Sequence, residues 1–97
     1  MIIYVDIDET MKIRGAITIL IERKIIHNGG YVCHIEDLVV DHDSRGKNVG
    51  SMLMKYAIQH AKNNDCYKVI LDCDTNVKGF YETLGFESKN IQMSLYL

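Results

Sequence analysis

The residues best suited to chemistry form a short basic run between two apolar stretches, Arg45-Gly46-Lys47-Asn48-Val49-Gly50. It directly precedes a segment with helical periodicity, so backbone N–H groups and the positive end of a helix dipole would point at one spot, where anions bind. Small residues let a phosphate approach the backbone, and Arg45 and Lys47 can add charge-assisted hydrogen bonds. The run therefore indicates a phosphate-binding loop. Spacing alone leaves open a plain helix-capping turn with two solvated bases.

A second group of interest is the pair of adjacent carboxylates Glu36 and Asp37, which stand inside an otherwise apolar segment. Unpaired carboxylates are costly to bury, so their presence there is unusual for a structural strand. Neighbouring side chains of a regular strand point to opposite faces, so one carboxylate could reach a ligand while the other serves the fold. The alternative is a surface edge with two exposed acids.

The elements that must position these residues follow from periodicity and turn signals. Apolar residues recur every three or four positions from Val49 to Asn64 (Val49, Met52, Leu53, Tyr56, Ala57 and Ala61), which predicts an amphipathic helix. The short apolar run around residues 66–73 predicts a buried strand that lies parallel to the strand before the helix. A second helix is expected from Thr75 or Asn76 to Leu84, with Gly85 as its left-handed C-terminal cap.

The remaining segments read as strands. They cover residues 2–7, 14–22, 31–41 and 91–97, and the turn signal Asn28-Gly29-Gly30 separates the second from the third. The expected fold is therefore α/β (α+β), a mixed and mostly antiparallel sheet containing one parallel strand-helix-strand unit. We expect a single domain over residues 1–97, which is small for one core and would benefit from oligomerisation.

Composition narrows the possible partners. The formal charge of −2 argues against nucleic-acid binding, although residues 44–71 hold five basic residues and one acidic residue. The longest apolar runs are too short for a membrane span, and the first residues lack the basic flank of a signal peptide. Three cysteines without a CxxC pair fit reduced, buried thiols, and the histidines show no metal-ligand spacing with them. We expect a cytoplasmic protein without a metal.

The basic run resembles the R/Q-x-x-G-x-G/A signature of the GNAT superfamily of acetyltransferases, whose members bind acetyl-CoA there. Asn48 stands in place of the first glycine of the signature, and asparagine is the non-glycine residue that best tolerates a left-handed conformation. The resemblance implies a GNAT-like fold and assigns the pyrophosphate of coenzyme A to Arg45, Gly46, Lys47, Asn48, Val49 and Gly50.

A narrower resemblance covers most of the chain. Five segments in the same order are similar to the glucosamine 6-phosphate N-acetyltransferase family: residues 22–27, His34-Ile35-Glu36-Asp37-Leu38-Val39-Val40, Arg45-Gly46-Lys47, residues 66–74, and Phe80-Tyr81-Glu82 with Gly85-Phe86. The resemblance implies direct attack of the sugar amine on acetyl-CoA, in the biosynthesis of UDP-N-acetylglucosamine. Other amines, such as a protein N-terminus or a polyamine, and a non-catalytic acyl-CoA-binding module remain alternatives.

The same resemblance implies individual roles. Asp72 would polarise or deprotonate the amine, since only a neutral amine can attack the thioester, and Tyr81 would hydrogen-bond the departing sulfur. Glu36 and Asp37 would hold the hydroxyls and amine of the sugar, and Lys68 its phosphate. The backbone of Leu38, Val39 and Val40 would pair with the pantetheine arm, and Asn76 would be a further coenzyme contact. The chain starts near the family's second strand, so it looks N-terminally shortened, and a homodimer with a pocket at the interface is expected.

Overall fold

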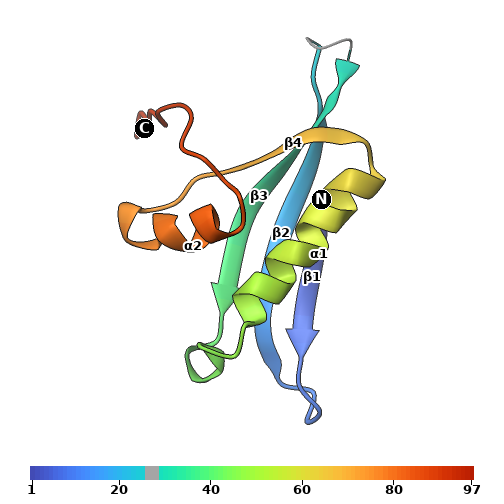
Figure 1. The fold of residues 1–97 in the computed structure, drawn as a ribbon, viewed down its shortest axis with the longest axis vertical. Helices are drawn as coiled ribbons and strands as arrows, with labels where there is room; N and C mark the ends of the chain where they lie inside the picture. Colours follow the sequence, from blue (N-terminus) through green and yellow to red (C-terminus); the bar gives the residue numbers. More distant parts are fainter. Residues whose placement is uncertain (26–28) are drawn as a thin grey trace.

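The computed structural model describes residues 1–25 and 29–97, and its regular elements follow the expected order (Figure 1). Asn28 of the expected turn and the end of the 22–27 segment lie outside the described residues. The elements are β1 (Ile2–Ile7), β2 (Ile13–Arg23), β3 (Tyr31–Val40), the 3-10 turn η2 (His42–Ser44), α1 (Val49–Asn63), β4 (Cys66–Leu71), the 3-10 turn η3 (Thr75–Val77) and α2 (Lys78–Thr83).

One sheet with the order β1-β2-β3-β4 forms the body of the described chain. β1 pairs with β2 and β2 with β3 in antiparallel fashion, whereas β3 and β4 run parallel and are joined through α1. A parallel pair needs such a crossover, because the chain must return to the same end of the sheet. The mostly antiparallel sheet and the parallel strand-helix-strand unit are therefore confirmed.

The core lies between α1 and one face of this sheet (Figure 1). Alternate residues of β2 and β3 point toward the helix. They pack against helix residues that are three and four positions apart and so lie on one face of α1. The buried set comprises Ile17, Ile19, Cys33, Ile35, Val49, Leu53, Met54, Ala57 and Ala61.

The apolar face of α1 is rotated slightly from the one that periodicity predicted. Met52 and Tyr56 are 42% and 58% exposed, while Met54 is fully buried. Tyr56 instead stacks on Tyr4 of the edge strand β1, with ring centroids 6.2 Å apart. Tyr56 therefore covers the margin of β1 rather than filling the core.

The predicted last strand is wrong. Residues 91–97 form no strand, and their apolar side chains are open to solvent, with Ile91 87% and Leu95 85% exposed. A strand needs a neighbour to receive its backbone hydrogen bonds, and this arm meets none within the described part of the chain.

The second helix is also shorter than expected, because η3 takes up its first turn and α2 ends at Thr83. Gly85 has φ +97°, as predicted for the residue that follows the helix.

Candidate active site

The site begins where β3 and β4 part. Their parallel ladder ends at the pair Ile35 and Leu71, yet β3 continues to Val40 while β4 stops. β2 still covers the other edge of β3 as far as Val40. Along residues 36–40, the edge of β3 that faces away from β2 therefore has no strand beside it in the region that the structure describes. Backbone groups on such an edge can receive an extended ligand through main-chain hydrogen bonds.

Leu38, Val39 and Val40, the residues expected to pair with pantetheine, lie on this edge. Leu38 and Val40 also pack against the core under α1, which fixes the direction of the strand. The edge leads directly into η2 and the basic loop. An extended chain that lay along β3 would thus end at the N-terminus of α1.

The basic loop has the backbone geometry that an anion-binding turn requires. Gly46 has φ +82°, a region that side chains with a Cβ rarely adopt, and Asn48 takes the left-handed conformation at φ 61°. The expectation that asparagine can replace the signature glycine is confirmed for the backbone. Asn48 is the N-cap of α1 but makes no side-chain capping hydrogen bond, and no acidic residue lies in the first turn of the helix. The first N–H groups of the helix are thereby left to a ligand or solvent.

Gly50 lies where three elements meet. A Cβ at Gly50 would be 3.5 Å from Cγ2 of Val40, 3.6 Å from Cζ of Phe80 and 3.9 Å from Cδ2 of Leu38. The end of β3, the first turn of α1 and α2 are therefore close neighbours. Arg45 and Lys47 are exposed beside this junction, in positions where their side chains are free to follow a bound phosphate.

The two adjacent carboxylates lie on a β-bulge. Thr18 pairs with Asp37 and Ile19 pairs with Ile35, so Glu36 is an extra residue in β3. Ile35 and Leu38 both pack against the core although they are three positions apart. The bulge removes the regular alternation on which the expectation of opposite faces rested, and both Glu36 and Asp37 are exposed. Bulges are frequent beside active sites because they redirect side chains in this way.

A small pocket of about 120 Å³ lies at the point where the two strands part. It is lined by Glu36 and Asp72 together with His34, Ile35, Ile70 and Leu71. Two of the residues predicted for the site are thus brought together. Asp72 follows the last residue of β4 and is exposed, so the burial expected for it on a strand is absent.

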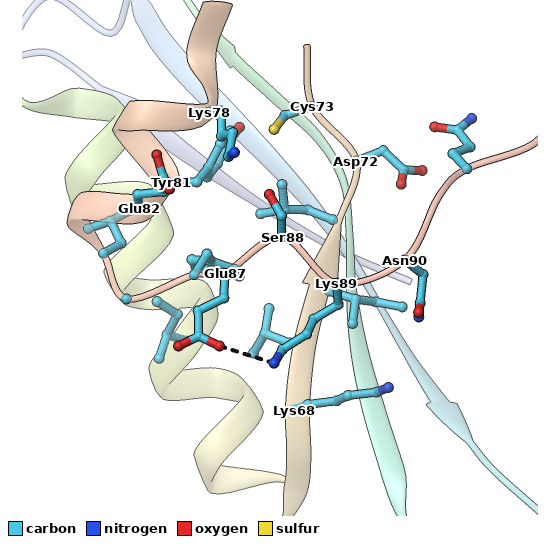
Figure 2. Close-up of a pocket in the computed structure, with 18 of the residues that line it drawn as sticks. Lys68, Asp72, Cys73, Lys78, Tyr81, Glu82, Glu87, Ser88, Lys89 and Asn90 are labelled. Atoms are coloured by element: carbon cyan, nitrogen blue, oxygen red, sulfur yellow. Dashed lines mark ion pairs between the residues drawn. The ribbon is translucent and has the colours of Figure 1, made fainter. Parts of the chain in front are cut away.

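A larger pocket of about 770 Å³ lies around the outer edge of β4, between that strand, α2 and the C-terminal arm (Figure 2). Lys68, Asp72 and Tyr81 all line it. Figure 2 shows Tyr81 extending from α2, whereas the carboxylate of Asp72 is directed away from α2. The two predicted catalytic side chains therefore share a pocket without facing one another. Asn76, on η3, lines neither of the two pockets.

Tyr81 is fixed among aromatic rings. Its ring meets those of Phe80 and Phe86 edge-on, with centroids 5.0 Å and 6.1 Å away. Burial raises the pKa of the Tyr81 phenol, and the nearby Cys73 raises it further. The hydroxyl is thus kept protonated through the neutral range, which is the state that can donate a hydrogen bond to a developing thiolate.

Sequence reasoning missed one pair of side chains at this site. His34 lines the small pocket, and its Nε2 atom lies 2.7 Å from Oε1 of Glu22 on the neighbouring strand. His34 and Glu36 are two positions apart on one strand, which was a signal for a shared face. The position of Glu22, however, depended on the register between β2 and β3, which the sequence alone does not give.

The described residues contain no cluster of three or more histidine, cysteine, aspartate or glutamate side chains that could hold a metal ion. Nor does any helix among them have the length and apolar character to cross a membrane.

A mixed sheet with parting parallel strands and a basic loop at a helix N-terminus defines a class of site that can receive an extended, anionic ligand such as an acyl coenzyme. Comparison with known proteins agrees, because the model of the acetyltransferase (GNAT) family matches residues 1–86. The chain belongs to this family.

Individual relatives are more specific. The chain is 46% identical over 85 residues to a glucosamine 6-phosphate N-acetyltransferase of Arabidopsis thaliana. The alignment covers 88% of this chain and 57% of the relative. It is 42% identical over 87 residues to glucosamine 6-phosphate N-acetyltransferase 1 of Oryza sativa subsp. japonica. That alignment covers 90% of this chain and 53% of the relative. The chain thus spans little more than half the length of these curated relatives.

Solved structures agree on the fold. The crystal structure of glucosamine-6-phosphate N-acetyltransferase from Arabidopsis thaliana superposes with a TM-score of 0.92 at 45% identity, over 97% of this chain and 65% of that one. The crystal structure of an acetyltransferase of Trypanosoma brucei superposes with a TM-score of 0.94 at 38% identity. The match covers 98% of this chain and 68% of that one. The predicted GNAT-like fold and the resemblance to this group of enzymes are both confirmed.

Proposed function

We propose that this chain transfers the acetyl group of acetyl-CoA to the amine of glucosamine 6-phosphate. The observation that carries the proposal is the parting of β3 and β4 beside the N-terminus of α1, which offers a free strand edge leading to a basic loop. The relatives named above, at 42% and 46% identity, supply the sugar. The reaction would be a step in the biosynthesis of UDP-N-acetylglucosamine.

The coenzyme would lie along this edge. Its pantetheine amides would pair with the backbone of Leu38, Val39 and Val40, and its pyrophosphate would accept hydrogen bonds from the loop of Arg45, Gly46, Lys47, Asn48, Val49 and Gly50. Both parts exist in the required order along the chain, since β3 ends directly before η2 and the loop. Asn76 would make a further contact with the coenzyme.

The sugar would occupy the small pocket and its surroundings. Glu36 and Asp37, both exposed on the bulge, would accept hydrogen bonds from the hydroxyls, and Asp72 would polarise the amine. Lys68, exposed on β4 with its Nζ atom 5.6 Å from the ring centroid of Tyr67, would contact the phosphate.

The reaction would proceed by direct attack. The lone pair of the neutral amine forms the new C–N bond at the thioester carbonyl, and the C–S bond breaks with its electrons remaining on sulfur. Tyr81 donates a hydrogen bond or its proton to the departing thiolate, and its raised pKa keeps that proton available. The amine gives up one proton in the process.

Thermal unfolding with and without acetyl-CoA tests the coenzyme site, because a ligand that binds only the folded state raises the unfolding temperature. A thiol-release assay with glucosamine 6-phosphate then tests transfer. Turnover with this sugar and not with glucosamine, a polyamine or a peptide N-terminus supports the proposal. Normal coenzyme binding without turnover for any amine would instead identify a non-catalytic acyl-CoA-binding module.

Substitution of Lys68 tests the sugar phosphate. Lys68→Ala should raise KM for glucosamine 6-phosphate and leave acetyl-CoA binding unchanged. Lys62→Ala, which removes an exposed lysine from α1, is the matched control and should have no effect. If KM for glucosamine 6-phosphate is the same in the unaltered chain, Lys68→Ala and Lys62→Ala, a group other than Lys68 binds the sugar phosphate.

We also propose a homodimer. The C-terminal arm alternates exposed apolar residues (Ile91, Met93, Leu95 and Leu97) with Gln92, Ser94 and Tyr96, as a half-buried strand does. β4 forms one edge of the sheet, and its outer side meets no further strand in residues 1–25 and 29–97. The arm of one copy could therefore pair with β4 of the other and complete the large pocket. Light scattering should give twice the chain mass, and Leu95→Lys should give the monomer mass.

The proposed location is the cytoplasm. All three cysteines are free thiols in the structure, which suits a reducing compartment. Fractionation of cells that carry the native protein would decide the location.

A further inference from the structure

His34 and Glu22 form a hydrogen-bonded pair that the proposed roles above do not use. Nε2 of His34 lies 2.7 Å from Oε1 of Glu22, and Nζ of Lys24 lies 2.9 Å from the same oxygen. The side chain of His34 is 23% exposed and that of Glu22 43%. The pair joins β2 to β3 on the face of the sheet opposite α1, since Cys33 and Ile35 on either side of His34 point into the core.

The carboxylate determines which imidazole nitrogen carries the proton. The hydrogen bond from Lys24 and, second, that from His34 lower the pKa of Glu22, so its carboxylate is ionised. An ionised carboxylate can only accept hydrogen bonds, and Nε2 of His34 must therefore donate. In neutral His34 the lone pair that can take up a proton consequently lies on Nδ1.

The position of this imidazole matches a step that the proposed reaction requires. His34 lines the small pocket together with Glu36 and Asp72, at the point where β3 and β4 part. The proposed sugar amine lies in this pocket and must lose a proton when the C–N bond forms. Asp72 is exposed beyond the end of β4, whereas His34 is held by two strands and a hydrogen-bond partner.

Resting on the proposed function, we propose that His34, held by Glu22, accepts the proton of the attacking amine. The amine nitrogen forms the C–N bond, its proton moves to Nδ1 of His34, and the C–S bond breaks to leave a thiolate that Tyr81 or water protonates. His34 then returns its proton to solvent. Glu22 is a positioning residue in this step, because it acts only through His34.

Other charged groups lie on the same strands or on the neighbouring strand β4, or directly after them. They are Lys24 after β2, Glu36 and Asp37 on β3, and Lys68 and Asp72 on and just after β4. Each of them could alter the pH profile of the reaction when substituted. The substitutions that test the proposal therefore leave all five of these groups in place.

The test compares the pH dependence of acetyl transfer in the unaltered chain with that of His34→Gln and Glu22→Gln. Loss of a general base lowers kcat by roughly 100-fold or more at neutral pH. The defect of His34→Gln should shrink as pH rises, because hydroxide ion can then accept the amine proton that the imidazole no longer takes. Glu22→Gln should lower kcat and leave KM for both substrates nearly unchanged, because an amide can also donate to Nε2 and no longer fixes the tautomer of His34. A merely structural role would raise KM or weaken acetyl-CoA binding as well.

His60→Gln is the matched control. His60 also forms a part-buried hydrogen bond, which joins its Nδ1 atom and the hydroxyl of Tyr4 at 2.8 Å, but it lies on α1 away from the pocket. Its profile should match that of the unaltered chain. Stabilisation by acetyl-CoA, measured for every variant, reports whether the fold and the coenzyme site are intact.

The outcomes separate this inference from the function on which it rests. Full activity and an unchanged pH profile in His34→Gln overturn the role of His34 and leave acetyl transfer standing. Absence of transfer by the unaltered chain overturns both. Should His34→Gln fail to fold, Glu22→Gln decides the matter, since an unchanged kcat in that variant overturns the proposal.

Discussion

Gly15 of β2 lies directly beneath Val49, the first residue of α1. A Cβ at position 15 would be 2.9 Å from Cγ1 of Val49 and 2.9 Å from the carbonyl oxygen of Val39, and Cδ1 of Leu53 would be 3.1 Å away. The added atom would meet the helix on one side and the backbone of β3 on another. The contact of Gly15 with Val49 therefore sets how closely the basic loop and the end of β3 approach each other.

Gly15→Ala should lower both stability and coenzyme affinity. Because the nearest groups include backbone, the helix must move, and such overpacking costs about 1–3 kcal/mol. Urea unfolding measures this loss, and calorimetry with acetyl-CoA measures the weaker binding expected from a displaced loop. Gly79→Ala is the control, since a Cβ there meets nothing within 4 Å and alanine favours the helix α2. Equal stability of Gly15→Ala and the unaltered chain would show that α1 is not fixed by this contact.

Asn48 supports a second prediction, because it holds a left-handed backbone at φ 61°. Asn48→Gly should keep the fold and coenzyme binding, whereas Asn48→Val should lose about 1–2 kcal/mol and bind acetyl-CoA more weakly. Asn90→Val, at an exposed position outside any helix or strand, provides the control substitution. Identical unfolding curves for the glycine and valine variants at position 48 would contradict the assigned role of its backbone.

Tyr81→Phe removes only the hydroxyl and keeps the ring that packs on Phe80 and Phe86. If Tyr81 protonates the leaving sulfur, kcat should fall by roughly 10–100-fold while KM for both substrates changes little, since the interaction forms in the transition state. The raised pKa of Tyr81 predicts that its contribution persists on the alkaline side, up to and beyond the ordinary phenol range near pH 10. Tyr56→Phe, at a stacked but exposed tyrosine on α1, should leave the rate unaltered. A normal kcat in Tyr81→Phe would exclude this role.

The sequence predicted the elements whose signals are local. Periodicity located α1, apolar runs located β1 to β4, and glycine marked the end of α2 at Gly85. The basic loop was recognised for the same reason, because its residues are contiguous. Even the asparagine at position 48 could be anticipated, since few residue types adopt its conformation.

Features that depend on pairing between distant residues were not predictable in this way. The bulge at Glu36 arises from the register of β3 against β2, and the same register brings Glu22 to His34. The arm at residues 91–97 has a strand pattern but no neighbouring strand in the described chain, so its pattern alone gave a wrong prediction. Side-chain alternation shows which face of a strand is apolar. It does not show which other part of the protein packs against that face.

Cys33 makes the stability of the fold depend on alkaline pH. Burial, and second the nearby Cys66, raises the pKa of its thiol from 9.0 to about 11. Below pH 9 the thiol is protonated in both states, and between about pH 9 and 11 the unfolded chain releases a proton that the folded chain keeps. The free energy of unfolding should therefore fall over this window, by an amount of about 2–3 kcal/mol from this group.

Urea unfolding with a reductant present measures this fall in the free energy of unfolding. Cys33→Ala should be less stable at neutral pH because of the cavity, yet show a shallower fall, whereas Cys73→Ala, at an exposed thiol, should keep the full slope. The same slope in Cys33→Ala as in the unaltered chain would assign the alkaline loss to other groups.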